Sequence, residues 1–292
     1  IPNIVNNRLT TRKLENLPDV RQFLKEAGSR YGSRVFNEKF LDKSEVFDAL
    51  QKDASLRRYL PESHTLHNYA QLRGICSRHP VVFLKPVRGS LGKGIIRIQR
   101  IGQDTWQASY ATLSGTKTQI FNGLAKLYSS ISGKVRTVRY LVQQGLPLIE
   151  VGGRPVDFRA LTQKNANGEW TVTSIVSRVA ASDQFVSNVA RGGKLFTVRE
   201  AVARSNLPPG FRATAAARLR RAALEIAKGI DTHIPAHFGE LGIDLALDTS
   251  GRIWLLEVNS KPSKNDNTPL TEGKIRPSVR MMIEYARYLS GF

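Results

Sequence analysis

The chain has 292 residues, 41% hydrophobic and 23% charged, which excludes a disordered tail and predicts one large or two modest domains with a real core. Lysine and arginine number 44 against 24 aspartates and glutamates, a formal net charge of +20, so polyanions or acidic surfaces are expected partners. The single cysteine, Cys76, excludes a disulfide framework and favours a cytoplasmic location. The sequence shows neither an apolar run of ~20 residues nor a secretion signal. It begins without a methionine, so we expect that a preceding segment can be missing.

Apolar residues recur at helical spacing through most of the first sixty positions. They predict helices within residues 18–31 and 36–60. The apolar run of residues 81–84 predicts a buried strand ending at Lys85, and residues 95–98 predict another strand. Because a strand rather than a helix follows the glycine-rich loop between them, we expect a hairpin.

The rest of the chain mixes predicted strands with predicted helices. The pattern indicates, in order, a helix over 121–132, a strand over 140–144, paired strands over 156–162 and 170–180, a helix over 211–230, paired strands over 242–247 and 252–258, and a final helix over 278–289. Gly145 and Pro147, just after the first of these strands, mark a hinge or crossover.

The last pair of strands carries the strongest local argument. If residues 249–252 form the turn, Ala246 faces Leu255 and Asp244 lies directly opposite Glu257. Two carboxylates in that position repel each other, so one loses its charge or destabilises the sheet unless a cation lies between them.

Asn259 shares the face of these two carboxylates because side chains alternate along a strand. Two carboxylates and an amide oxygen form a hard, all-oxygen set that favours Mg²⁺. The alternative, which spacing alone leaves about equal, is that one of the acids pairs with Arg252, Lys261 or another cation.

The hairpin loop supplies candidate phosphate ligands. Lys85 is held at the end of an apolar strand, and backbone N–H groups of a Gly/Ser loop can wrap phosphate oxygens. The candidates in the loop are Gly89, Ser90, Gly92 and Lys93. The spacing matches neither a P-loop nor a Rossmann loop, and glycines in hairpins commonly serve the turn alone.

Several arginines follow in the second half. Asp157 and Arg159 share one face of a predicted strand, Arg178 ends the next strand, and a polar loop contains Asn188 and Arg191. Forked guanidinium groups suit bidentate contacts to phosphate or carboxylate. For any single arginine, a structural pair with a nearby acid is the simpler interpretation, and the joint placement with a metal candidate favours a site.

Taken in order, these motifs resemble the ATP-grasp superfamily. Lys85 and the loop through Gly92 look like the family's lysine and phosphate-covering loop, while Asp244, Glu257 and Asn259 stand where its magnesium ligands stand. The resemblance implies an α+β fold, with two subdomains clasping a nucleotide between antiparallel sheets.

Further motifs extend the resemblance. Asp42-Lys43 resembles the Asp-Lys whose lysine reaches ATP phosphates, and Gln143, Gln144 and Leu146 fall at the interdomain strand that cups adenine. The loop containing Asn188 and Arg191 resembles the Asn-x-x-Arg-Gly-Gly loop of bacterial glutamate-adding ligases, and Asp157-Phe158-Arg159 resembles the Asp-x-Arg of tubulin tyrosine ligases.

The likeness over the whole chain is to the YheC/YheD group of endospore coat-associated ATP-grasp proteins. It lies in Asn6-Asn7-Arg8, Phe36-Asn37, Leu41-Asp42-Lys43, Leu60-Pro61-Glu62 and residues 257–262. It implies a remnant of a preceding domain over 1–33, a helical entry segment over 34–74, a subdomain with the glycine loop over 75–144 and a subdomain with the metal site over 145–292. His64 and Gln144 depart from the family pattern, the latter where many relatives carry an acid.

The resemblance further implies an ATP- and Mg²⁺-dependent carboxylate-amine ligase acting through an acyl phosphate on a small molecule or an acidic peptide. In that assignment Lys43 and Lys85 bind phosphates, while Arg159, Arg178 and Arg191 hold the acyl phosphate or carboxylate. A kinase on the same fold and a non-catalytic polyanion or spore-surface binding protein are the alternatives. Nucleic acid is a less favoured partner because no nucleic-acid-binding motif occurs. We expect no membrane contact and a cytoplasmic location, to which the resemblance adds spore association.

Overall fold

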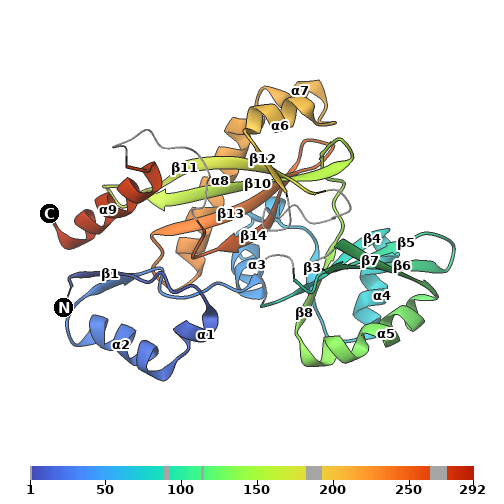
Figure 1. Ribbon diagram of the computed structural model, residues 1–292, viewed down its shortest axis with the longest axis horizontal. Helices are drawn as coiled ribbons and strands as arrows, with labels where there is room; N and C mark the ends of the chain where they lie inside the picture. Colours follow the sequence, from blue (N-terminus) through green and yellow to red (C-terminus); the bar gives the residue numbers. More distant parts are fainter. Residues whose placement is uncertain (1, 89–92, 113–114, 182–192, 264–274) are drawn as a thin grey trace.

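The computed structural model describes residues 2–88, 93–112, 115–181, 193–263 and 275–292, which form two large sheets lying side by side (Figure 1). The first sheet has the order β3-β8-β4-β5-β6-β7, and the second has the order β12-β11-β10-β13-β14 with β9 beside β10. The first comprises β3 (Ser63–Leu66), β4 (Val81–Pro86), β5 (Ile96–Arg100), β6 (Thr105–Thr112), β7 (Gly115–Asn122) and β8 (Tyr140–Gln144). The second comprises β9 (Glu150–Val151), β10 (Arg154–Lys164), β11 (Trp170–Val179), β12 (Lys194–Phe196), β13 (Glu240–Leu247) and β14 (Ile253–Asn259).

The smaller hydrophobic core lies on one face of the first sheet. Val82 and Leu84 of β4 are buried there against α4 (Tyr69–Arg78) and α5 (Leu124–Thr137). Lys85 alternates with them and therefore belongs to the opposite face, which is free of this helical cover. The strand predicted from the apolar run of residues 81–84 is present, and the antiparallel pairing of β4 with β5 confirms the hairpin.

The larger core fills one face of the second sheet. It unites α3 (Lys43–Gln51), the 3-10 turn η1 (Arg57–Tyr59), α6 (Val198–Arg204) and α8 (Ala215–His233) with alternate residues of β10, β13 and β14. The polar positions of the same strands, including Asp244 and Arg159, therefore lie on the other face. The short helix α7 (Pro209–Arg212) precedes α8.

The two ends of the chain pack together. β1 (Ile4–Asn6) pairs in parallel with β2 (Arg34–Phe36), and α1 (Arg12–Glu15) and α2 (Pro18–Ser29) connect them. Phe36 packs edge-on against Tyr285 of α9 (Pro277–Ser290), with ring centroids 5.4 Å apart. Both termini accordingly lie on the same side of the molecule (Figure 1). None of the helices described is long and apolar enough to cross a bilayer.

Three elements differ from the expectation. The helix predicted over 121–132 begins only at Leu124, because Phe121 still belongs to β7 and Gly123, with φ of 102°, turns the chain. The hairpin of β6 and β7 was not predicted. The helical stretch predicted over 36–60, broken by turns, comprises α3 and η1, but its first residue, Phe36, belongs to β2.

The segment expected as a helical entry, residues 34–74, contributes to different parts of the molecule. Its residues 41–60 join the larger core, whereas Leu66 and Leu72 belong to the smaller one. The two sheets are thus connected by two chain segments, one running from η1 into β3 and one from β8 through Gly145 to β9. The four domain boundaries drawn from the sequence remain predictions.

Gly145 lies where the second connection leaves the first sheet, and we predict that Gly145→Ala destabilises the protein. Its N–H donates to the Val81 carbonyl at 2.7 Å, and an added Cβ would lie 2.7 Å from Val81 side-chain and carbonyl atoms. Overpacking of this kind lowers the free energy of unfolding by about 2 kcal/mol, measurable by urea denaturation. Gly133→Ala is the control, because an added Cβ in α5 meets no atom within 4 Å and raises stability by ~0.5–1 kcal/mol. Equal midpoints for the two variants would contradict the prediction.

Candidate functional site

Two lysines and a glutamate meet between the two sheets. Lys43 is the first residue of α3, where Asp42 caps the helix by accepting a hydrogen bond from the Glu45 N–H at 2.9 Å. The Lys43 ammonium donates to Glu257 Oε1 of β14 at 2.8 Å across a separation of 214 residues. The Lys43 N–H also bonds to the Val87 carbonyl beyond β4. The helix N-terminus therefore joins elements from both sheets at one place.

Lys85 lies beside this pair, partly buried near the end of β4. Its ammonium donates to Gln143 Oε1, and Gln143 Nε2 donates in turn to Ser63 Oγ at 2.8 Å. Burial and the nearby charge of Lys43, partly opposed by Glu257, together lower the pKa of Lys85 to about 8. The described contacts use one of its three N–H donors. An incoming anion would therefore be stabilised by a desolvated, incompletely paired ammonium.

Asp244 is the centre of a buried ion network on the second sheet. It lies opposite Arg159 in the β10–β13 register. Arg159 Nη2 donates to Asp244 Oδ2 at 2.9 Å and Arg178 Nη2 lies 3.0 Å from Asp244 Oδ1. Arg178 also pairs with Asp157, its register partner. Although desolvation opposes the change, Arg159 and Arg178 hold the pKa of the Asp244 carboxyl down to about 2. The structure thus brings together Asp157, Arg159 and Arg178, which the sequence analysis singled out.

The strand register confirms that Asp244 faces Glu257, with one correction. Near the turn the pairs are Leu247 with Ile253 and Leu245 with Leu255, so the expected facing of Ala246 with Leu255 is wrong by one residue. A bulge in the β13–β14 ribbon, between the pairs near the turn and Asp244, restores the predicted pairing of Asp244 with Glu257.

The reason for the bulge lies in the core. Leu255 and Val258 are both buried in it although they lie three positions apart, an odd spacing that strict alternation cannot place on one face. The adjacent apolar pair Leu255-Leu256 was the available signal. Asn259 pairs with Gly242, so it shares the face of Asp244 and Glu257 as expected.

The three oxygen-bearing side chains suit Mg²⁺ by chemistry, since two carboxylates and an amide form a hard donor set. Glu257 has 27% of its side chain exposed and is therefore accessible to an ion from solvent. Asp244 also shows the salt-bridge alternative that the sequence left open, although with Arg159 and Arg178 rather than Arg252 or Lys261. No group of three or more His, Cys, Asp or Glu residues gathers as a metal site within the described ranges. An ion there would be held by two carboxylates and Asn259.

The predicted adenine strand lies beside the two connecting segments. Gln144 ties them together: its Oε1 accepts from the Glu62 N–H at 2.7 Å, and its own N–H donates to the Glu62 carbonyl at 2.9 Å. Gln143 is buried and holds Lys85. The half-buried Leu146 follows at the exit from β8. The adenine assignment of these three residues remains a prediction.

Other predicted ligands lie at the limits of the described structure. Gly89, Ser90, Gly92, Asn188 and Arg191 lie outside the described residues. Lys93 is described and exposed at the start of the chain leading into β5. The site as described therefore rests on the strand and helix positions rather than on the two loops.

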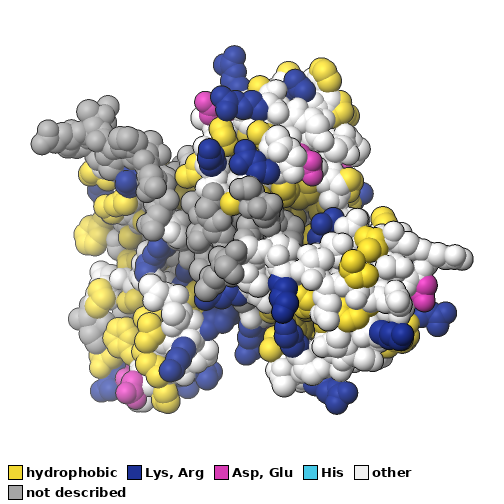
Figure 2. Space-filling model, turned by 45° about the vertical axis from the view of Figure 1, so that its right-hand side comes forward, with side chains coloured by type: hydrophobic (Ala, Val, Ile, Leu, Met, Phe, Trp, Pro, Cys, Tyr) yellow, Lys and Arg dark blue, Asp and Glu magenta, His cyan; other side chains and the backbone are white. Residues whose placement is uncertain are grey.

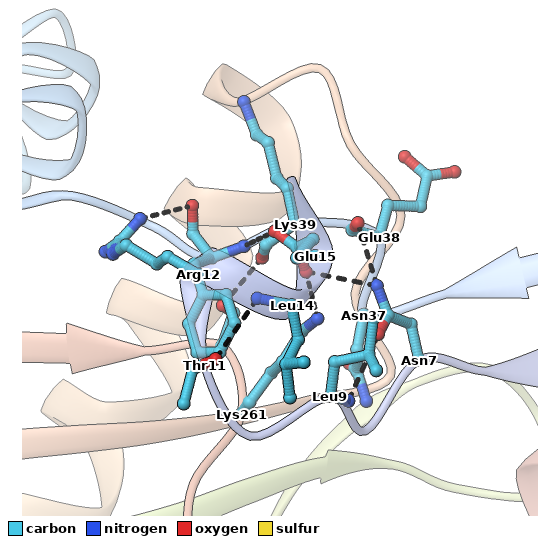
Figure 3. Close-up of polar contacts among 12 residues, drawn as sticks. Asn7, Leu9, Thr11, Arg12, Leu14, Glu15, Asn37, Glu38, Lys39 and Lys261 are labelled. Carbon is cyan, nitrogen blue, oxygen red and sulfur yellow. Dashed lines mark hydrogen bonds and ion pairs between the residues drawn. The ribbon is translucent and has the colours of Figure 1, made fainter. Parts of the chain in front are cut away.

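A polar cluster that was not predicted connects α1 to the chain just after β14, next to the site. Glu15, at the end of α1, accepts hydrogen bonds from the Phe40 N–H at 3.0 Å and Asn7 Nδ2 at 3.1 Å, and it pairs with Lys261 (Figure 3). The Lys261 ammonium lies 4.5 Å from the Phe40 ring centroid. The cluster ties the N-terminal segment to the chain just beyond the candidate metal ligands.

Two further contacts continue this support. Ser260 Oγ donates to the Lys39 carbonyl at 2.7 Å and accepts from the Leu41 N–H at 3.2 Å. Arg12 donates to the Phe40 and Leu41 carbonyls immediately before the Asp42-Lys43 pair. Residues near the two ends of the chain thereby fix the start of α3 against the end of β14. Sequence offered little signal for this, because Arg12 and Phe40 are 28 residues apart and Glu15 and Lys261 are 246 residues apart.

Comparison with known proteins identifies the fold and then the family. The D-alanine-D-alanine ligase from *Coxiella burnetii* superposes with a TM-score of 0.53 at 11% identity, covering 98% of this chain and 68% of that one. The family model described as YheC/D-like ATP-grasp matches residues 32–289. The chain therefore belongs to the YheC/D-like ATP-grasp family, and the predicted α+β ATP-grasp fold is confirmed.

Two curated relatives are endospore coat-associated proteins of *Bacillus subtilis* (strain 168). YheD is 30% identical over 292 residues, covering 99% of this chain and 63% of its own length. YheC is 26% identical over 226 residues, covering 76% of this chain and 60% of its own length. The chain thus spans less than two thirds of the length of either relative.

We predict that Glu15→Ala removes the main support beneath the site. Lys261 has 3% of its side chain exposed and would be left buried without its carboxylate partner. We expect the free energy of unfolding to fall by about 3 kcal/mol, measured by chemical denaturation. Glu284→Ala removes an exposed i,i+4 pair with Arg280 and serves as the control, with an effect of about 0.5 kcal/mol or less. An effect of Glu15→Ala no larger than this control would refute the bracing role.

Proposed function

We propose that the chain is an ATP-dependent carboxylate-amine ligase. The observation that carries this proposal is the convergence of Lys43, Lys85 and Glu257 between two sheets, next to the Asp244 network. Family membership supports ATP as the nucleotide. Phosphoryl transfer depends mainly on positioning and charge neutralisation, and these residues offer both without a nucleophilic side chain.

Each group has a proposed role in this chemistry. Lys43 and Lys85 bind nucleotide phosphates, and Gln143, Gln144 and Leu146 lie along the adenine. Asp244, Glu257 and Asn259 would hold Mg²⁺, which would neutralise phosphate charge when bound. Arg159 and Arg178 orient the substrate carboxylate and its acyl phosphate by forked hydrogen bonds. From outside the described ranges, Gly89, Ser90, Gly92, Asn188 and Arg191 are proposed to cover the phosphates and the intermediate, together with the exposed Lys93.

The proposed reaction has two balanced steps. A substrate carboxylate oxygen attacks the γ-phosphorus of ATP, the bond from that phosphorus to the bridging oxygen breaks, and ADP leaves. An amine nitrogen then attacks the acyl carbon, inorganic phosphate leaves, and the nitrogen loses a proton to give an amide. The side chains position and neutralise these groups throughout.

The proposed acceptor is a small carboxylate or an acidic peptide. The charge of +20 would concentrate such anions near the protein, and Figure 2 shows Lys and Arg side chains greatly outnumbering acidic ones on the visible face. The names of YheD and YheC also motivate a proposed link of this chain to the endospore coat. We propose that the protein is made, and first acts, in the cytoplasm.

Glu257→Gln tests the enzymatic role directly. It removes one proposed magnesium ligand and the partner of Lys43 while keeping the side-chain size, so we expect ATP turnover to fall at least ~100-fold. Phosphate release from ATP, screened with amino acids and peptides, measures this, and circular dichroism checks the fold.

The product of the same assay separates the alternatives. ADP with free phosphate and an amide indicates a ligase, whereas a phosphorylated acceptor indicates a kinase. Glu284→Gln is the charge-matched control and should turn over ATP like the wild type. Unchanged turnover in a folded Glu257→Gln variant would instead favour a non-catalytic binding protein.

We further predict that nucleotide affinity depends on pH through Lys85. With a pKa of about 8 in the free protein, Lys85 is mostly charged at pH 7 and mostly neutral at pH 9.5. An anion that restores the charge must bind with proton uptake, so affinity weakens as pH rises above 8, approaching ~tenfold per pH unit.

Calorimetry of a non-hydrolysable ATP analogue with Mg²⁺ between pH 7 and 9.5 measures this slope. Lys85→Met should bind more weakly at pH 7 and lose the slope, because the titrating group is gone. A flat profile in the wild type, or the same slope in Lys85→Met, would show that Lys85 does not contact the phosphates.

A further inference from the structure

A basic cavity lies beside the β13–β14 turn, at the opposite end of β14 from the proposed nucleotide site. It has a volume of about 420 Å³ and is lined by Arg58, Arg218, Arg221 and Arg252 together with the β13–β14 turn. Pockets of ~300–1,000 Å³ accommodate small molecules. β14 runs from Ile253 at this cavity to Glu257 in the cleft, roughly 13 Å at ~3.3 Å per residue, so the two sites are distinct.

The floor of the cavity is a rigidly organised turn. Asp248 is buried and its Oδ1 accepts from the Ser250 N–H at 2.9 Å, from Ser250 Oγ at 2.6 Å and from the Arg252 N–H at 2.9 Å. Its Oδ2 accepts from Trp254 Nε1 at 2.8 Å. Gly251 adopts φ of +80°, where an added Cβ would meet the Phe211 ring at 2.7 Å. The turn therefore holds a fixed shape before any ligand arrives.

Three of the four arginines are also held in place. The Arg252 guanidinium lies 3.6 Å from the Trp254 ring centroid and donates to the Arg58 carbonyl at 2.8 Å. Arg218 donates to the Gly251 carbonyl at 2.7 Å. Arg58 lies 4.9 Å from the ring centroid of Tyr59. Because a guanidinium has five N–H donors, each of these groups retains donors for a ligand while its orientation is already set.

Charge in the cavity is unbalanced. Glu225 pairs with Arg58 and accepts from the Tyr59 hydroxyl at 2.7 Å, while none of the residues that line the cavity is acidic. Four guanidinium groups, set against Glu225 and the buried Asp248 carboxylate beneath the turn, leave about two positive charges within one small volume. Like charges held together in this way favour binding of a multivalent anion.

We propose that this cavity binds a compact anion bearing two or more phosphate or carboxylate groups. Forked guanidinium donors match both oxyanion types. A cavity of this volume accommodates molecules up to drug size. The cavity also borders both connections between the sheets. Arg58 belongs to η1, which leads into β3, and the Thr249 N–H donates to the Pro147 carbonyl at 2.9 Å. An anion in the cavity would therefore lie beside these connections rather than in the proposed nucleotide site.

Calorimetric titration with tripolyphosphate, and separately with citrate, tests the proposal. The protein is first saturated with a non-hydrolysable ATP analogue and Mg²⁺ to occupy the cleft, at constant ionic strength because salt screens exposed charge. We expect one further binding event with at least one of the two probes. Arg218→Gln/Arg221→Gln should weaken that event at least tenfold without changing affinity for the analogue.

Arg199→Gln/Lys228→Gln is the matched control, since it removes the same charge from exposed positions on α6 and α8 outside the cavity. It should keep the additional event. Arg252→Gln, a single change at the cavity rim, provides a second test if the double variant does not fold. The proposal is overturned if neither probe shows a further event, or if the control weakens it as much as the cavity variants. Preference for one probe identifies the oxyanion type.

Discussion

The arrangement of charge between the two sheets is the constraint on which the rest of this structure depends. Lys43 and Lys85 lie together beside Glu257, and Asp244 lies between two arginines. The two lysines repel each other, and so do the two arginines. Each pair is stable only because the fold holds a carboxylate beside it, Glu257 for the lysines and Asp244 for the arginines. The fold does this with elements from both sheets and the start of α3, and so keeps two lysines close together beside one carboxylate.

Much of the remaining architecture serves to hold these elements in position. The Glu15–Lys261 pair and the Ser260 hydroxyl fix the start of α3 against the end of β14. Gln144 binds one connecting segment to the other, and Gly145 lets the chain pass close to β4. Preorganisation of this kind lets a site stabilise charge without rearranging, and the basic cavity at the hinge is built by the same means.

Sequence reasoning succeeded where a local pattern reports burial directly. The apolar run of residues 81–84 predicted the strand that ends at Lys85, and the ribbon spacing placed Asp244 opposite Glu257. It failed where packing overrides the pattern. The bulge that lets Leu255 and Val258 share the core shifted the register by one residue, and the β6–β7 hairpin has a largely exposed second strand whose pattern carries little apolar signal.

The sequence by itself determined the family, the α+β class and the types of side chain available, because composition and short motifs are written in consecutive residues. Tertiary structure alone decided which cation meets which carboxylate. Lys43 pairs with Glu257, which is 214 residues away. Asp244 pairs with Arg159 and Arg178, although Arg252 and Lys261 are nearer in the chain. The physical reason is that electrostatic pairing depends on distance in space and on burial, and both are fixed only when the sheets and helices pack.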